Sequence, residues 1–246
     1  MASRRSGPDA RARILRAATK LLAAGGRTAV TTRAVCAAAG AQPPTIYRHF
    51  GDMQGLLDEV ARETLAVHVR EQTGRALTND PVEDLRQGWD LHIAFGLAHP
   101  DAFALLYSAP SIPASRSVIH EGVAVLEGLV ARIAEAGLLR VDVALATDLI
   151  HAAGTGVTLA LAGTPVEERD PRLCESMREA VLDAITVPAP VEIQGAGLDA
   201  LAPDRVAVHA VALQTLLTDA PSVLTLTEQA LLGDWLERLV RGERSS

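Results

Sequence analysis

Residues 31–50, TTRAVCAAAGAQPPTIYRHF, constrain the fold of this chain more than any other stretch. The threonines at its start suit the N-terminal cap of a helix, because a hydroxyl oxygen accepts hydrogen bonds from the unpaired N–H groups of the first turn. Gly40 suits the end of that helix, where the backbone turns left-handed. Pro44 suits the first position of a second helix, because its missing N–H would have no partner there. The pattern therefore predicts two short helices joined by a tight turn, the second over residues 45–50.

The second predicted helix is less than two turns long and is dense in hydrogen-bonding side chains. Ile46 and Phe50 are four residues apart, so they lie on one face and can anchor the helix to a core. The polar side chains on or near its surface are Thr45, Tyr47, Arg48 and His49. A helix, a glycine-containing turn and a short donor-rich helix form the helix-turn-helix layout, whose second helix enters the major groove of DNA.

The charge distribution supports a nucleic-acid partner although the net charge of the 246 residues is −7. Residues 1–50 carry nine basic residues and one acidic residue, a net charge of +8, whereas the remainder carries 14 and 29, a net charge of −15. This asymmetry is typical of a basic nucleic-acid-binding end on an acidic body. The alternative is a basic helix that is merely solvated, and it is weakened because the basic residues coincide with the helix-turn-helix.

Four blocks in this order resemble the N-terminal domain of the TetR/AcrR family of bacterial transcription regulators. The blocks are RARILRAATKLLAAGG at 11–26, TTRAVCAAAG at 31–40, PTIYRHF at 44–50 and Leu56–Leu57. The resemblance covers about residues 10–65, roughly a quarter of the chain. It implies an all-α fold, with a three-helix helix-turn-helix domain over 1–51 and a larger helical ligand-binding and dimerisation domain over 52–246. One departure is Met53, where the family usually has a lysine that contacts phosphate.

Beyond the helix-turn-helix, apolar residues recur at helical spacing and no convincing strand alternation is present. With a first helix at about 9–24, the predicted helices are 52–76, 82–98, 101–107, 115–136, 142–162, 170–185, 204–217 and 227–240. A Pro- and Gly-rich stretch at 187–203 predicts a linker. The extra C-terminal segment from about residue 190 is not explained by the resemblance. In its last helix we expect Thr227 as the cap and Leu231, Leu232, Trp235 and Leu239 facing a core.

Base reading is predicted for Thr45 and Arg48, with help from Pro43 and Pro44. Arginine can donate two parallel hydrogen bonds to guanine, and proline or threonine carbons can contact the thymine methyl group. The resemblance implies phosphate contacts, which set register rather than sequence, for Thr32, Arg33, Tyr47 and His49. Tyr47 could instead be a packing residue with a wet hydroxyl, and a partly buried capping histidine at 49 would look the same in sequence.

A recognition helix this short predicts a homodimer on a palindromic double-stranded DNA operator, with its two heads about 34–36 Å apart. The dimer contact is predicted on the helices at 142–162 and 170–185, because the first is apolar nearly all round and needs cover on two faces. The family also implies a small-molecule effector. The candidate effector-binding residues are chosen because they can supply apolar contact surface or a polar group: Trp89, His92, Phe103, Tyr107, His151 and Thr155. Each of these could instead be an ordinary core residue.

Enzymatic motifs such as GxSxG, GxxxxGK[ST], HExxH and CxxC do not occur in the sequence. Cys36 and Cys174 offer neither a disulfide framework nor a metal-ligand spacing, so we expect no metal, no cofactor and a reducing bacterial cytoplasm, with nucleoid association on DNA. The longest nearly apolar run, 152–163, is too short for a membrane span. The sequence thus predicts a ligand-responsive transcription repressor. The alternatives are a small-molecule binding protein with a degenerate head, supported by Met53, and an enzyme on a helical body.

Overall fold

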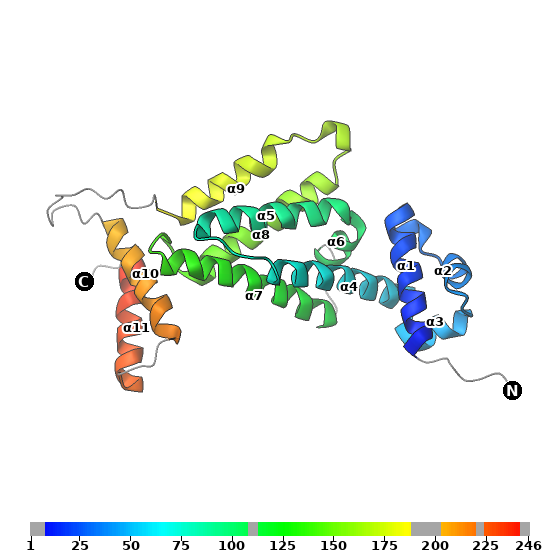
Figure 1. The fold of residues 1–246 in the computed structure, drawn as a ribbon, viewed down its shortest axis with the longest axis horizontal. Coiled ribbons are helices and arrows are strands. Elements are labelled where there is room, and N and C mark those ends of the chain that lie inside the picture. The colour runs from blue at the N-terminus through cyan, green and yellow to red at the C-terminus, as the bar shows by residue number, and fades with distance from the viewer. Residues whose placement is uncertain (1–7, 108–112, 188–202, 220–223, 242–246) are drawn as a thin grey trace. The chain divides into compact units, whose positions relative to one another are not determined.

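The computed structural model describes residues 8–107, 113–187, 203–219 and 224–241. This described part has an all-α architecture, as predicted (Figure 1). A single isolated bridge, between Leu139 and Thr186, is the only extended pairing among them. The helices are α1 (Pro8–Ala29), α2 (Thr32–Ala39), α3 (Pro43–Phe50), α4 (Met53–Thr73), α5 (Pro81–Ala98), α6 (Pro100–Tyr107), α7 (Pro113–Glu135), α8 (Val143–Ala162), the 3-10 turn η1 (Val166–Glu168), α9 (Arg172–Ile185), α10 (Pro203–Asp219) and α11 (Leu226–Arg241).

Local signals place the boundaries of the first three helices. Gly25 and Gly26 interrupt the helical backbone inside α1, with φ of −149° and 66°, where the sequence predicted its end. The Thr31 hydroxyl caps α2 by accepting a hydrogen bond from the Ala34 N–H at 3.2 Å. Gly40 ends α2 at φ 59°, a left-handed conformation that costs glycine little. The helix α3 begins at Pro43, two residues earlier than predicted, since prolines lose nothing in a first turn.

The chain forms two compact units, and each has its own apolar core. The first contains residues up to 75 together with 94–122 and 158–166. Its largest fully buried side chains include Ile14, Ile46, Leu56 and Phe103, so α1, α3, α4 and α6 all contribute. Because α3 is anchored there by Ile46, its orientation is set by this core. The predicted boundary after residue 51 stays a prediction.

The second unit contains residues 76–93, 123–157 and the chain after 166. Leu85, Ile133, Leu139 and Ile185 are fully buried in its core. The backbone bridge at Leu139 is closed by the Arg140 N–H, which donates to the Ile185 carbonyl at 2.8 Å, and by the Val187 N–H, which donates to the Leu138 carbonyl at 2.9 Å. These bonds fix the end of α9 beside the loop that precedes α8.

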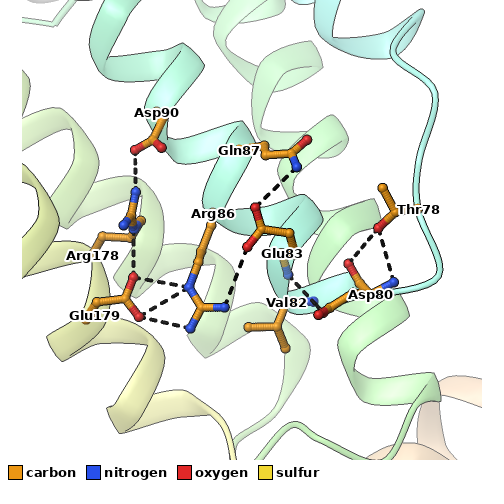
Figure 2. A network of polar contacts seen from close by, with 9 residues as sticks. All are labelled: Thr78, Asp80, Val82, Glu83, Arg86, Gln87, Asp90, Arg178 and Glu179. Carbon is orange, nitrogen blue, oxygen red and sulfur yellow. Dashed lines mark hydrogen bonds and ion pairs between the residues drawn. The ribbon is translucent and has the colours of Figure 1, made fainter.

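Ion pairs attach α9 to α5 within the second unit (Figure 2). The Arg86 guanidinium donates to both carboxylate oxygens of Glu179, at 3.1 and 2.9 Å from Nε and Nη2. Arg178 Nη1 donates to Asp90 Oδ1 at 2.6 Å. Hydrogen bonds in which both partners are charged are stronger than neutral ones, and the forked geometry of arginine adds orientation. The network therefore sets which face of α9 points toward α5 and which points outward.

A buried carboxylate pins the start of α5. Asp84 is fully buried, and its carboxylate accepts a hydrogen bond from Arg132 on α7 and two at 3.0 Å from the Thr78 N–H. Burial raises the pKa of this carboxyl, but the hydrogen bonds from Arg132 and from Thr78 outweigh burial and hold the pKa below its ordinary value. Asp84 therefore stays ionised, and it depends on Arg132 for its charge balance.

The predicted core face of the last helix is wrong in the structure. Leu231, Trp235 and Leu239 are 46%, 52% and 48% exposed, whereas Leu236 is the buried residue of α11. The helix lies beside α10 (Figure 1), and only its Leu236 side is covered. The cap also differs from the prediction, because the Thr225 hydroxyl and the Glu228 carboxylate bond each other's backbone N–H groups in a capping box.

By length and composition, α8 could cross a membrane: its mean hydropathy reaches 1.3, and 33% of the apolar window is buried within the chain. The predicted apolar run of 152–163 therefore underestimated this helix. Residues 143–157 of this helix belong to the second unit, whose core includes Ala146, Ile150 and Val157.

Candidate nucleic-acid interface

The helix α3 divides its side chains between the core and solvent. Ile46 is fully buried, whereas Tyr47 is 47% exposed and Arg48 is exposed. The two prolines at its start are exposed as well, so the N-terminal turn of α3 is accessible from solvent. Helix-turn-helix proteins contact base edges mainly with the N-terminal residues of this helix. The predicted base-reading residues therefore lie on an accessible face, with Thr45 half-buried at its margin.

Two predicted phosphate ligands from different helices lie together. The Thr32 hydroxyl on α2 is 3.5 Å from the Tyr47 hydroxyl on α3, so one donor from each helix converges at the same point. Arg33 follows Thr32 and is exposed. The Thr32 and Tyr47 hydroxyls lie together near the start of α2, where the N-terminal N–H groups and the helix dipole favour a negatively charged group such as phosphate.

His49 differs from the other predicted ligands. Its side chain is half-buried, with its ring centroid 6.3 Å from that of Phe50. Its Nε2 atom is shielded from solvent and has no hydrogen-bond partner among the residues that the structure describes. Any contact of His49 with DNA would therefore use Nδ1. His49 is thus partly buried, as expected for a capping histidine, and it still has one ring nitrogen that could bind phosphate.

An ion-pair cluster ties the helix-turn-helix to α4. Glu59 accepts hydrogen bonds from Arg62 on its own helix, at 2.7 and 3.0 Å, and from Arg11 on α1. The Arg11 guanidinium also lies 5.4 Å from the centroid of the Phe50 ring at the end of α3, within cation–π range. The hydrogen bond from Arg62, followed by that from Arg11, lowers the pKa of Glu59 to about 2 against the opposing effect of burial. This carboxylate therefore stays charged and holds α1 and α4 together.

The start of α4 packs tightly against the end of α3. Asp52 caps α4 by accepting a hydrogen bond from the Gly55 N–H at 2.7 Å. A Cβ atom on Gly55 would lie 2.2 Å from the Phe50 carbonyl oxygen, so only glycine allows this approach. Met53 is half-buried at the first position of α4. The helix that follows the recognition helix is thus held in fixed register with it.

Arg27 is a residue of this region that the sequence analysis did not single out. It is exposed, and its Nη2 donates to Gln54 Oε1 at 2.7 Å, one residue after Met53. Its position just after Gly25 and Gly26 was the only sequence signal for it, because the glycines redirect the chain there. The structure therefore places a guanidinium near the point where the family usually has a lysine.

The predicted effector residues fall into two groups, one in each compact unit. In the second unit, a Cβ on Gly154 would lie 3.6 Å from both Trp89 and His92, so α8 and α5 are in close contact there. His151 and Thr155 flank Gly154 in sequence. In the first unit, the rings of Phe103 and Tyr107 are 4.5 Å apart between centroids. The structure therefore places each of the two groups in a different compact unit.

Burial determines the protonation of both groups. Burial lowers the pKa of His151, although the nearby Asp148 charge opposes the shift. Burial also raises the pKa of Tyr107 to about 12. The Trp89 indole N–H donates a hydrogen bond to the Cys174 Sγ atom at 3.3 Å, so this N–H already has a partner within the chain. The Thr155 hydroxyl oxygen is shielded from solvent and has no hydrogen-bond partner among the described residues. His151 and Tyr107 are therefore both uncharged near pH 7.

Comparisons with known proteins agree with the geometry of the head. Residues 14–60 match the sequence model described as bacterial regulatory proteins, tetR family. No curated protein sequence matches the chain.

Several solved structures share the fold. A transcriptional regulator of the TetR/AcrR family from Thermobifida fusca YX-ER1 is 22% identical, with a TM-score of 0.58 over 71% of this chain and 97% of that one. A transcriptional regulator from Rhodococcus sp. RHA1 is 16% identical, with a TM-score of 0.55 over 73% and 99%. A protein studied for the control of antibiotic production by bacterial hormones is 22% identical, with a TM-score of 0.57 over 74% and 100%.

The two comparisons agree with the resemblance found in the sequence. The family model falls on α1 to α4, which contain the exposed face of α3 and the Thr32–Tyr47 pair. The structural matches extend over the helical body but are too distant to show more than the fold. Residues 14–60 therefore form the DNA-binding domain of the tetR family of bacterial regulatory proteins, and the chain has the fold of the family's transcription regulators.

Proposed function

We propose that this chain is a transcription repressor that binds a palindromic operator as a homodimer and leaves it when a small hydrophobic or amphipathic effector binds. The observation that carries the DNA part is the accessible face of α3, where Arg48 and Tyr47 project from a helix anchored by buried Ile46. The net charge of +8 over residues 1–50 supplies attraction to phosphate. Such regulators act in the bacterial cytoplasm on the nucleoid.

Within the interface, we assign base reading to Arg48 and Thr45, with apolar contacts from Pro43 and Pro44. Phosphate binding is assigned to Thr32, Arg33 and Tyr47, and to His49 through Nδ1. The 3.5 Å separation of the Thr32 and Tyr47 hydroxyls supports one shared phosphate oxygen between α2 and α3. Phosphate contacts of this kind fix the protein on the duplex, and the arginine selects the sequence.

Exposed apolar faces on α8 and α9 support the dimer. On α8, Leu145 and Leu149 are 46% and 41% exposed, and they share a face with the small exposed residues Ala152 and Gly156. On α9, Leu173 and Met177 are each 38% exposed, on the side opposite the ion pairs to α5. Apolar helix faces of this length on a soluble protein are typical of helix–helix interfaces. The pairing also gives the apolar surface of α8 a protein partner.

The effector is assigned to Trp89, His92, His151 and Thr155 in the second unit. A neutral histidine, a shielded hydroxyl and an indole ring on α5 and α8, which are in close contact at Gly154, favour a small molecule with a large apolar part and a few polar atoms. Phe103 and Tyr107 form a second group in the first unit. Release from DNA requires that the effector bind the non-DNA-binding conformation more tightly than the DNA-binding one.

A selection of bound sequences from random duplex DNA tests the proposal. We expect a palindrome whose half-sites are centred about one helical turn apart. The selected duplex should then bind in fluorescence anisotropy with log affinity falling by about 0.9 per log unit of salt for each phosphate neutralised. A chain that selects no sequence and shows little salt dependence would instead be a small-molecule binding protein with a degenerate head.

The dimer is tested separately by light scattering after size exclusion. The double variant Leu149→Glu/Met177→Glu places charges on both apolar faces, and we expect it to weaken dimerisation and operator binding together. Asp148→Asn, on the same helix and exposed, is the matched control. Tight binding of one palindrome by a strict monomer would contradict the proposal.

A further inference from the structure

The N-terminal turn of α3 lacks the free backbone donors that a helix start usually offers. A helix normally leaves its first N–H groups without a partner inside the helix. Pro43 and Pro44 occupy the first two helical positions, and proline has no N–H. The next N–H, that of Thr45, already donates to the Gln42 carbonyl oxygen at 2.9 Å. These three backbone positions therefore offer no donor to a DNA phosphate.

Gln42 occupies the N-cap position of α3, but its side chain does not cap the helix. Its φ of −99° and ψ of 148° are extended, and the side chain makes no capping hydrogen bond. A capping side chain accepts from the second or third N–H of the helix. Here Pro44 lacks the second N–H, and Thr45 donates the third to the backbone. The amide group of Gln42 therefore has no part in holding the start of α3.

This amide group lies where a recognition helix contacts bases. Gln42 is exposed at the start of α3, and helix-turn-helix proteins contact base edges mainly with the N-terminal residues of this helix. Glutamine can form two hydrogen bonds with one adenine, because its oxygen accepts from the N6 amino group and its nitrogen donates to N7. An adenine thus uses both the donor and the acceptor of the Gln42 amide.

The residues after Gln42 favour a base pair over a phosphate as its partner. Pro43 and Pro44 are exposed and present carbon atoms only. The thymine opposite an adenine presents its methyl group in the same groove, so an A·T pair offers apolar surface beside the adenine. The predicted phosphate donors Thr32 and Tyr47 lie together elsewhere, with their hydroxyls 3.5 Å apart. A phosphate has only acceptor oxygens, so it would leave the Gln42 oxygen without a partner.

We propose that Gln42 reads an adenine in each half-site of the operator, as a second specificity-determining residue besides Arg48. The proposal rests on the proposed function, since it requires a duplex in contact with α3. Gln42 and Arg48 are six residues apart, about 9 Å along the helix axis. Neighbouring base pairs are about 3.4 Å apart along the duplex. The adenine and the guanine are therefore different base pairs, separated by about two to three steps.

Parallel selections from random duplex DNA with the full chain test this assignment. The parent is expected to select an adenine in each half-site, and Gln42→Ala should lose that preference while keeping the guanine. Arg48→Ala should show the reverse. Gln42→Glu should replace the adenine by cytosine, because a carboxylate accepts from the cytosine N4 amino group. A palindrome that Gln42→Ala selects unchanged would overturn the role of Gln42 alone, whereas a parent chain that selects no palindrome would contradict the proposed function itself.

Fluorescence anisotropy with two operators measures the same contact as an affinity. The second operator carries G·C instead of the A·T pair in one half-site, and the parent is expected to bind it about 10-fold more weakly. Gln42→Ala should bind the two operators equally, with an unchanged melting temperature because no capping bond is lost. If Gln42→Ala were weaker than the parent on both operators but still discriminated between them 10-fold, Gln42 would bind phosphate, and the proposal would be overturned.

Discussion

The helix-turn-helix and the C-terminal hairpin are both pairs of helices with one face in contact with the chain and one face in solvent. The outward face of α3 carries Tyr47 and Arg48, whereas the outward face of α11 carries Leu231, Trp235 and Leu239. The degree of exposure is similar, with Tyr47 at 47% and Trp235 at 52%. The chemistry of the two faces therefore distinguishes their partners: the first suits a polyanion and the second suits another apolar protein surface.

The same contrast holds for the arginines of the two compact units. Arg48 projects into solvent from α3, whereas Arg132 reaches a fully buried carboxylate. Arginine suits both environments, because its guanidinium is always charged and donates several hydrogen bonds in a fixed plane. Substitution of each arginine is therefore expected to affect a different property, and the following experiments measure DNA affinity and stability separately.

The largest effect is expected for Arg48→Ala on operator binding. Loss of a bidentate contact to guanine costs about 1–3 kcal/mol per half-site, so a dimer would lose about 2–6 kcal/mol. The melting temperature should stay unchanged, since Arg48 is exposed. Fluorescence anisotropy with the selected operator measures the affinity, and Arg16→Ala, exposed on α1, is the control. Equal losses for both variants would mean that α3 attracts DNA without reading it.

The second effect is expected for Arg132→Ala on stability. The substitution removes the arginine that forms an ion pair with the buried Asp84 carboxylate, and loss of one partner of a buried ion pair costs about 3 kcal/mol. Urea denaturation followed by circular dichroism measures the loss. Arg172→Ala is the matched control, because its ion pair with Asp170 lies at the surface, where the arginine side chain is 83% exposed. A similar loss for both variants would remove the distinction between inward and outward arginines.

The sequence predicted the head better than the hairpin, and the physical reason is locality. Thr31, Gly40 and Asp52 set helix ends through bonds to residues a few positions away, so their roles can be read from sequence. The core face of α11 could not be read in this way. Leu231, Leu232, Trp235 and Leu236 form one broad apolar side of the helix, and which of them is buried depends on where α10 packs.

Long-range contacts of the site were also beyond the sequence. Arg11 and Glu59 are 48 residues apart, and Arg27 and Gln54 are 27 apart, yet each pair is in contact in the fold. The sequence spacing of these residues does not predict either contact, because the distance between the side chains depends on how α1 packs on α4. The effector candidates show the same limit. Their residue types were a chemical guess, and the fold alone divides them between two cores.

Acid should loosen the head through Glu59. Its pKa is lowered to about 2 in the folded chain from an ordinary value of 4.5. Its contribution to stability is therefore complete above pH 4.5 and is lost as the pH falls toward 2. Because the Arg11 side chain is partly exposed, we expect about 2 kcal/mol from this group. Unfolding free energies measured between pH 5 and 2.5 should show a smaller acid loss in Glu59→Gln than in the parent chain.

The smallest effect is expected for Met53→Lys, which is a gain. Met53 starts α4 beside the end of α3, at the position where the family usually has a phosphate-binding lysine. An added ammonium there would neutralise one more phosphate per head. We expect the salt dependence of log affinity to steepen by about 0.9 for each head that makes the contact, and affinity at low salt to rise modestly.

Arg27 sharpens this last experiment, because its guanidinium already lies at Gln54, next to position 53. If Arg27 supplies the phosphate contact that lysine makes in relatives, Arg27→Ala should reduce the salt slope by about as much as Met53→Lys raises it. The double variant Arg27→Ala/Met53→Lys should then restore the parent slope. If the slope of log affinity against log salt were unchanged in all three variants, the DNA backbone would lie away from α4. The DNA-binding face of the head would then be confined to α2 and α3.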